Sequence, residues 1–159
     1  PTPPSASAAG SGQYSAPEWY PLRGTTVIGC TWNNGCSGGY HGYAAIDLAR
    51  NTTGSVAGDP VYAAGAGLAT IYQTGNTCGG SGTNANAIQV DHGGGVTSLY
   101  FHLGSFAISG PTWVDQNTVI GYVGHTGYVD PCTFNHLHFE VWINGGLVEP
   151  MSWLSVNAG

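Results

Sequence analysis

The segment of residues 136–143, HLHFEVWI, constrains the fold of this chain more than any other stretch. Its apolar residues fall at every second position, and successive side chains of a β-strand point to opposite faces. The segment therefore predicts a strand with Leu137 and Phe139 on one face and His136 and His138 together on the other. Neutral imidazole is the commonest protein ligand for zinc, so this pair indicates a metal site. The alternative is a pair of ordinary surface or core histidines.

The remaining sequence indicates strands and turns. The chain has 159 residues, of which 27 are glycine and only 6% are charged. No segment shows the period of a helix. We therefore predict one all-β domain over residues 18–159, preceded at residues 1–17 by a Pro-, Ser-, Ala- and Gly-rich linker or loosely ordered N-terminal arm. The turn at residues 92–95, His-Gly-Gly-Gly, joins two of the strands as a hairpin. The expected strands are residues 44–48, 60–64, 67–72, 87–91, 96–103, 119–123 and 138–143, with strand and loop over residues 19–40.

The charge balance excludes several classes of partner. The formal net charge is −6, lysine is absent, and Arg23 and Arg50 are the only permanently charged basic residues. A surface that follows nucleic-acid phosphates needs many basic side chains, so we expect no nucleic-acid binding. No apolar run approaches the length that spans a bilayer, so we expect no membrane insertion. A wall polymer would have to be held by shape, hydrogen bonds and aromatic side chains.

The four cysteines indicate an oxidising environment. An even count after an opening segment that resembles a processed linker predicts two disulfides, although four cysteines allow three connectivities. We favour Cys30–Cys36, which closes a short loop, and Cys78–Cys132, which ties a central loop to the approach of the 138–143 strand. The alternative is a zinc site of four cysteines, which the absence of a Cys-x-x-Cys pair disfavours.

Five short sequences resemble one known family when taken in order. They are HGYAAIDLA at residues 41–49, GDPVYAA at 58–64, YFHL at 100–103, IGYVGHTG at 120–127 and HLHFE at 136–140. Together they resemble the lysostaphin/LytM-type zinc metallopeptidases, which cut peptide bonds in bacterial peptidoglycan, over about residues 24–154. The resemblance implies an open antiparallel β-sheet or sandwich with loops that form a groove over the sheet.

The same resemblance implies one zinc ion per chain, with His41, Asp47 and His138 as its ligands. Such a site leaves one position open, where zinc lowers the pKa of water to about 7 and polarises a carbonyl. The sequence departs from the commonest pattern, in which the first histidine lies four residues before the aspartate. That position is Tyr43 here, and His41 lies six residues before Asp47. The alternative is a surface histidine beside an impaired site.

The resemblance also implies two catalytic histidines that do not bind the metal, His102 and His136. Their expected roles are proton transfer to the leaving amine and stabilisation of the oxyanion, and the sequence leaves open which residue has which role. We interpret Glu140 as a hydrogen-bonded carboxylate that supports a ligand. His92 is expected to be exposed in its glycine-rich turn, and His125 is a candidate for the rim of the cleft.

The function predicted from the sequence is that of a secreted or envelope-located, monomeric zinc endopeptidase. It would hydrolyse peptide bonds in the stem or cross-bridge of peptidoglycan. Two alternatives remain open: a non-catalytic relative that binds the wall or activates a hydrolase, and a zinc peptidase that acts on glycine-rich proteins. The bond that is cleaved and the biological role are not encoded in any motif of this sequence.

Overall fold

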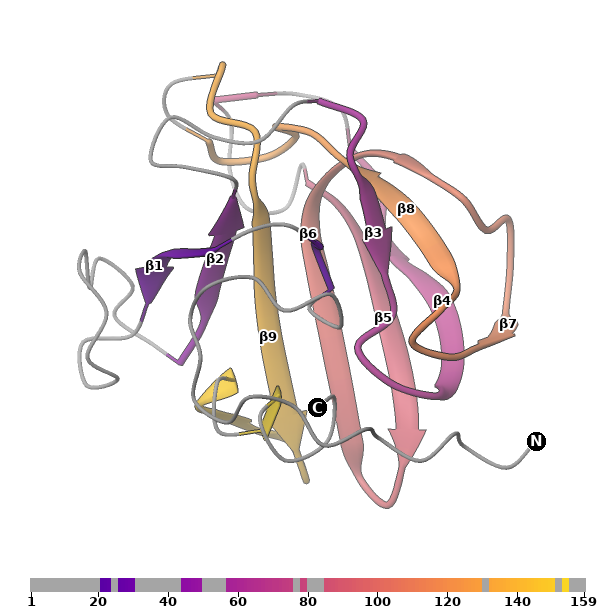
Figure 1. The fold of residues 1–159 in the computed structure, drawn as a ribbon. Coiled ribbons are helices and arrows are strands. Elements are labelled where there is room, and N and C mark those ends of the chain that lie inside the picture. The colour runs from indigo at the N-terminus through magenta and orange to yellow at the C-terminus, as the bar shows by residue number, and fades with distance from the viewer. Residues whose placement is uncertain are drawn as a thin grey trace.

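A computed structural model describes residues 21–23, 26–30, 44–49, 57–75, 78–79, 85–129, 132–150 and 153–154, with the backbone alone for residues 26–30. This part of the chain forms a ten-stranded antiparallel β-sheet (Figure 1). The strands are β1 (Thr26–Cys30), β2 (Ile46–Ala49), β3 (Pro60–Tyr62), β4 (Gly67–Gln73), β5 (Asn86–Gly93), β6 (Val96–Phe106), β7 (Thr112–Val114), β8 (Val119–Val123), β9 (Leu137–Ile143) and β10 (Gly146–Val148). The predicted all-β class and open antiparallel sheet are therefore confirmed.

The central strands of the sheet are β9, β6 and β5. The main order is β1-β2-β9-β6-β5-β4-β7, while β10 pairs with β9 and β8 pairs with both β3 and β6. The strand β6 is long enough to pair with β9 through residues 96–101 and with β8 through residues 103–106. Figure 1 shows β5 and β6 as a long hairpin, with β9 beside β6. This arrangement places β2, β9 and β6 next to one another, and these strands carry most of the predicted site.

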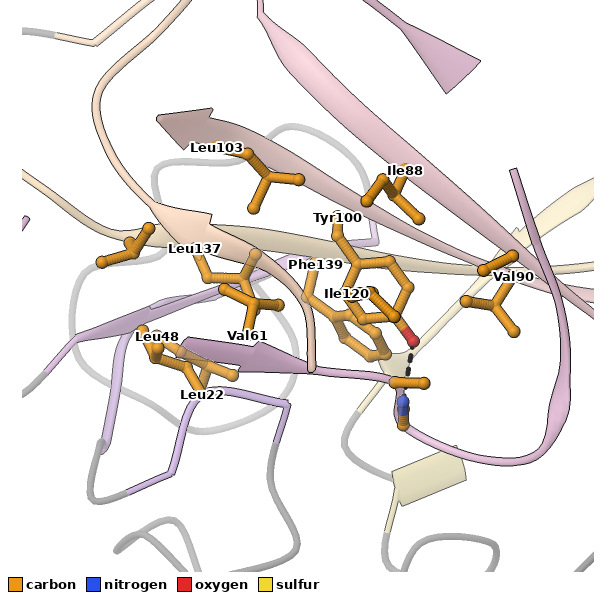
Figure 2. Packing of buried hydrophobic residues seen from close by; sticks show 14 of the residues in the cluster. Leu22, Leu48, Val61, Ile88, Val90, Tyr100, Leu103, Ile120, Leu137 and Phe139 are labelled. Atoms are coloured by element: carbon orange, nitrogen blue, oxygen red, sulfur yellow. Dashed lines mark hydrogen bonds between the residues drawn. The ribbon is translucent and has the colours of Figure 1, made fainter. Parts of the chain in front are cut away.

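One face of the sheet buries the hydrophobic core (Figure 2). Tyr100 of β6 and Phe139 of β9 are fully buried, and their ring centroids lie 5.2 Å apart. Val61 of β3 and Ile120 of β8 belong to the same cluster, so the β3–β8 pair covers this face. The Tyr100 hydroxyl accepts a hydrogen bond of 2.8 Å from the main-chain N–H of Ala64 (Figure 2). This bond satisfies a polar group that would otherwise be costly to bury.

The expected strands agree with the observed ones, with two omissions. The bounds of β8 are as predicted, and β9 begins one residue earlier than predicted. The short strands β7 and β10 were not predicted. The predicted arm at residues 1–17 lies outside the described residues, so the division into arm and domain stays a prediction. Within the described segments, no helix has the length and apolar character that crossing a membrane would require.

Candidate active site

Asp47 and His138 lie side by side on the face of the sheet opposite the core. They are register partners on the adjacent strands β2 and β9. Ile46 and Leu48 are fully buried in the core, so strand alternation directs the carboxylate between them to the other face. Asp47 Oδ1 lies 3.1 Å from His138 Nδ1 and 3.7 Å from His136 Nε2. Asp47, His136 and His138 are each at most 5% exposed, which makes this a desolvated cluster of a carboxylate and two imidazoles.

The second nitrogen of His138 is held by another carboxylate. His138 Nε2 lies 2.8 Å from Glu140 Oε2, and Trp142 Nε1 donates a hydrogen bond of 2.9 Å to Glu140 Oε1. Burial alone lowers the pKa of His138, but the hydrogen bonds with Asp47 and Glu140 outweigh it and raise the pKa to about 9. Each ring nitrogen of His138 thus faces a carboxylate oxygen, an arrangement that favours the protonated ring.

An irregularity in β6 places His102 in the same cluster. Between the paired positions Asn86–Leu103 and Ile88–Tyr100, β6 has one residue more than β5. Such a bulge lets two consecutive side chains project to one face. Tyr100 and Leu103 belong to the core, whereas the Phe101 and His102 rings lie 5.5 Å and 5.8 Å from that of His138. His102 accordingly has a φ of 71°, a left-handed conformation that is uncommon for a residue other than glycine.

Main-chain carbonyls orient the rings of His102 and His136. Nδ1 of His102 donates to the carbonyl of Thr126 at 2.7 Å, and Nδ1 of His136 donates to the carbonyl of Phe134 at 2.9 Å. Each neutral ring then carries its lone pair on Nε2. The two ring centroids are 4.8 Å apart. Burial, together with the nearby His136 and His138, lowers the pKa of His102 to about 3, which keeps this ring neutral at ordinary pH.

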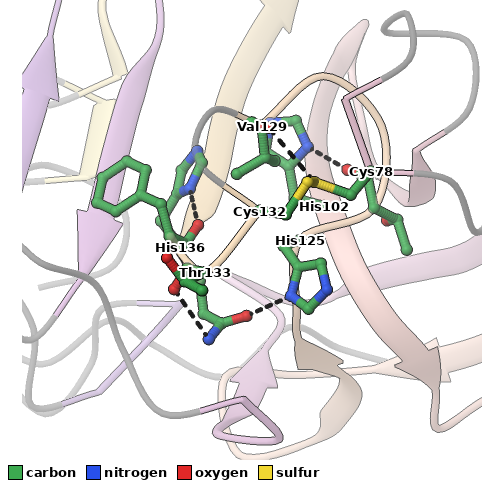
Figure 3. Close-up of a disulfide and its surroundings, with 10 residues drawn as sticks. Cys78, His102, His125, Val129, Cys132, Thr133 and His136 are labelled. Atoms are coloured by element: carbon green, nitrogen blue, oxygen red, sulfur yellow. Dashed lines mark hydrogen bonds between the residues drawn. A yellow bond between two sulfur atoms is a disulfide. The ribbon is translucent and has the colours of Figure 1, made fainter.

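A disulfide supports the loops beside these histidines (Figure 3). Cys78 and Cys132 are bonded, with their Cα atoms 5.7 Å apart, which confirms one of the two predicted pairs. A disulfide uses two of the four thiols that the alternative cysteine–zinc site would need. Cys36 lies outside the described residues and only the backbone of Cys30 is described, so their pairing stays a prediction. His125 Nδ1 donates a hydrogen bond of 2.7 Å to Asn135 Oδ1, close to the same disulfide in Figure 3.

The structure therefore brings together four of the five predicted site residues, namely Asp47, His102, His136 and His138. The fifth, His41, lies outside the described residues, so the complete ligand set stays a prediction. Among the side chains that are described, no three His, Cys, Asp or Glu residues meet the geometry of a metal site.

One histidine prediction was wrong. His92 is not exposed in a turn but lies at the end of β5, partly buried, where it contacts Ala66 O and Ser98 Oγ at 2.8 Å each.

Two residues that contact the candidate site were not singled out from the sequence. Thr126 is buried, and its hydroxyl donates to Leu103 O at 2.8 Å and accepts from Asn86 N at 2.9 Å. These bonds fix the loop whose carbonyl orients His102. The other neighbour is Trp142, which shares a face of β9 with His138 and Glu140. The same two-residue alternation that exposed the histidine pair, continued to position 142, would have indicated it.

Comparison with known proteins agrees with this arrangement. Residues 43–150 match the family model described as peptidase family M23. Over 95 residues, or 60% of this chain, the sequence is 39% identical to the DD-carboxypeptidase/endopeptidase Mpg of Neisseria meningitidis serogroup B. The match covers only 20% of the length of that curated relative, and the same holds for Mpg of Neisseria gonorrhoeae.

Solved structures share the fold. The catalytic domain of the antimicrobial peptidase lysostaphin from Staphylococcus simulans is 28% identical, with a TM-score of 0.52 over 90% of each chain. A mutant of the catalytic domain of the prophage-encoded M23 protein EnpA from Enterococcus faecalis is 21% identical. Its TM-score is 0.55, with 79% of this chain and 87% of that chain covered. The family match spans most of the chain, and the sheet and its histidine cluster accord with it: the chain belongs to peptidase family M23.

Proposed function

We propose that this chain is a zinc endopeptidase that hydrolyses peptide bonds in bacterial peptidoglycan. The observation that carries the proposal is the pair Asp47 and His138, 3.1 Å apart on a desolvated sheet face, with His102 and His136 beside it. Family membership supports a peptidase, and the sequence resemblance described above supports zinc and the peptidoglycan substrate.

The donor atoms fit a zinc ion. Two tetrahedral zinc ligands bound at about 2.0–2.1 Å lie about 3.3 Å from each other. Asp47 Oδ1 and His138 Nδ1 are within a few tenths of an ångström of that separation. A buried carboxylate beside an imidazole also offers the ligand types that zinc prefers. His41 is the proposed third ligand, and a site of two imidazoles and one carboxylate would leave a position open for the reaction.

The chemistry that zinc supplies when bound is polarisation of the scissile carbonyl and a lower pKa for water. The chain supplies the proton transfers. His102 and His136 each keep a proton on Nδ1, tied to a main-chain carbonyl, and present Nε2 as the atom that exchanges a proton. A neutral Nε2 accepts a proton from water, and the resulting cation can donate it to the leaving amine or to the oxyanion. Because carbonyls fix both rings, little reorganisation accompanies these transfers.

The substrate would lie along the open sheet face. An aromatic row leads away from His138: the rings of Phe101 and His138 are 5.5 Å apart, and those of Tyr72 and Phe101 are 6.1 Å apart. Tyr72 is 53% exposed, so its ring is available to a bound peptide. With a formal charge of −6, the chain would hold wall peptides through such apolar contacts and hydrogen bonds rather than through basic side chains. The Cys78–Cys132 disulfide supports action outside the cytoplasm.

Three single substitutions test the assignment of roles. His138→Ala should lower zinc content and peptidase activity together, because a ligand is lost. His136→Ala and His102→Ala should keep zinc bound and lose on the order of 10²–10⁴ in rate, because a proton-transfer or oxyanion group is lost. Zinc content and turnover are measured on the same samples, with purified sacculi and a soluble glycine-rich peptide as substrates. A His136→Ala chain that loses zinc while His138→Ala keeps it would reverse the assigned roles. Cleavage of the soluble peptide alone would overturn the proposed substrate.

A further inference from the structure

Glu140 is held between two N–H groups on one face of β9. Its Oε2 lies 2.8 Å from His138 Nε2, and its Oε1 lies 2.9 Å from Trp142 Nε1. The indole nitrogen of tryptophan can only donate a hydrogen bond, and an ionised carboxylate can only accept. Glu140 is 7% exposed, so water competes little for these oxygens. Both bonds are satisfied only when His138 carries a proton on Nε2.

This requirement determines which nitrogen of His138 is available to a metal. We propose that Glu140 and Trp142 together lock the tautomer of His138, so that its Nδ1, the nitrogen that faces Asp47, is the metal-binding atom. The inference rests on the proposed zinc function and adds two positioning residues to it. A neutral imidazole binds a metal through one nitrogen and keeps its proton on the other, where a carboxylate commonly holds it. Trp142 is the less obvious member, because its N–H faces Oε1 and would oppose any donor placed there.

A glutamine at position 140 exposes the role of Trp142. The amide has nearly the shape of the carboxylate, but one end accepts and the other donates. If the oxygen faces His138, the NH₂ group meets the indole N–H, and two donors oppose each other. If the oxygen faces Trp142, the NH₂ group donates to His138 Nε2 and leaves the proton on Nδ1, where it blocks the metal. Glu140→Gln therefore loses either a buried hydrogen bond or the metal-binding tautomer.

Removing the indole donor should relieve this conflict. In a Glu140→Gln/Trp142→Phe chain, the amide oxygen is free to turn toward His138, and no N–H opposes the NH₂ group. Trp142→Phe alone leaves the carboxylate intact and removes the hydrogen bond from Trp142 Nε1 to Glu140 Oε1. The tautomer lock thus predicts that a second substitution, which removes a further contact, restores function to the first. If Glu140 and Trp142 acted through packing alone, the double variant should instead be worse than either single variant, because the effects of the two lost contacts would add.

The test is the zinc affinity of the full chain, measured with zinc alone by competition with a chromogenic chelator. Glu140→Gln should weaken affinity about 10–100-fold. Trp142→Phe should change it a few-fold at most, and the double variant should return to within a few-fold of Trp142→Phe. Trp113→Phe is the matched control, because Trp113 is 62% exposed on β7 and should restore nothing in the Glu140→Gln background.

A measurement on the unmutated chain keeps the inference testable if Glu140→Gln does not fold. In the zinc-loaded protein, the ¹⁵N shifts of His138 should show a proton on Nε2 and the metal on Nδ1, and the reverse would overturn the lock. Normal zinc binding by Glu140→Gln, or no recovery in the double variant, would also overturn it. An unmutated chain that takes up no zinc would instead overturn the proposed function, and this inference with it.

Discussion

The left-handed conformation of His102 makes a specific prediction about stability. Its φ is 71°, and among the described residues Asn144 is the only other non-glycine residue with a positive φ. Asn144 lies in a turn, where this conformation is ordinary, whereas His102 lies within β6. We expect His102→Gly to be more stable than His102→Ala. Both substitutions remove the imidazole and its bond to Thr126, so their difference reports the backbone alone.

The size of this difference follows from two opposing effects. An alanine in the left-handed region is strained by roughly 1–2 kcal/mol, and glycine is not. Glycine loses more conformational entropy on folding than alanine, by roughly 0.5–1 kcal/mol. Glycine should therefore be favoured at position 102 by up to about 1.5 kcal/mol. Thr70 on β4 has no positive φ and is the control: there the order should reverse, with alanine favoured by about 0.5–1 kcal/mol.

Urea unfolding of the four variants measures these differences. A chelator is present throughout, so that a change in metal affinity does not appear as a change in the free energy of unfolding. The difference between the two positions, about 1–2 kcal/mol, is the strain that the bulge imposes on residue 102. If alanine equals or exceeds glycine in stability at both positions, the left-handed conformation is not a constraint on this site, and the argument fails.

Three further predictions concern the fold. Replacing Cys78 and Cys132 with serine should lower the free energy of unfolding by about 2–4 kcal/mol in urea melts, because the disulfide joins residues that are 54 positions apart in the sequence. An unchanged free energy of unfolding would show that the disulfide does not constrain the unfolded chain. Burial lowers the pKa of His92 below its usual 6.5. As the pH falls, the unfolded chain therefore takes up this proton before the folded chain does. The contribution of His92 to stability is present above pH 6.5 and is lost as the pH falls through the lower pKa of the folded chain. Urea melts between pH 8 and pH 5 should show a smaller loss for His92→Gln, and parallel profiles would contradict this. Tyr100→Phe leaves a buried main-chain N–H without its partner and should cost about 1–3 kcal/mol in the same assay, whereas a neutral effect would mean that the N–H finds another acceptor.

Side-chain positions were predicted most accurately from the sequence in strands with a regular alternation of apolar and polar residues. The alternation in β9 was sufficient to place Leu137 and Phe139 in the core and the histidine pair on the opposite face. The same rule explains the position of Asp47 between two core residues. The strands β7 and β10 have three residues each, too few for an alternation to be recognised, whereas the equally short β3 was predicted as part of the longer run at residues 60–64.

The features that were missed depend on contacts between distant segments. The bulge at His102 follows from pairing with β5, and neither glycine nor asparagine marks it in the sequence. His92 was expected to be exposed because glycines follow it, yet Ala66 and Ser98 supply partners that bury it. The sequence indicated that Glu140 would be hydrogen-bonded, but only the structure identifies Trp142 as the second donor to it.

The bulge in β6 also determines how far the site can move. His102 is flanked by Tyr100 and Leu103, both fully buried, and the carbonyl of Leu103 accepts hydrogen bonds from Asn86 Nδ2 and Thr126 Oγ1. Any shift of the His102 backbone would therefore disturb the core. In the catalytic role proposed for it, a His102 ring held in this way could neither follow a poorly placed substrate nor adapt to a different one. Under the proposed function, a change of substrate preference would therefore come from the loops around the sheet, while the sheet would keep the proposed catalytic histidine in one fixed geometry.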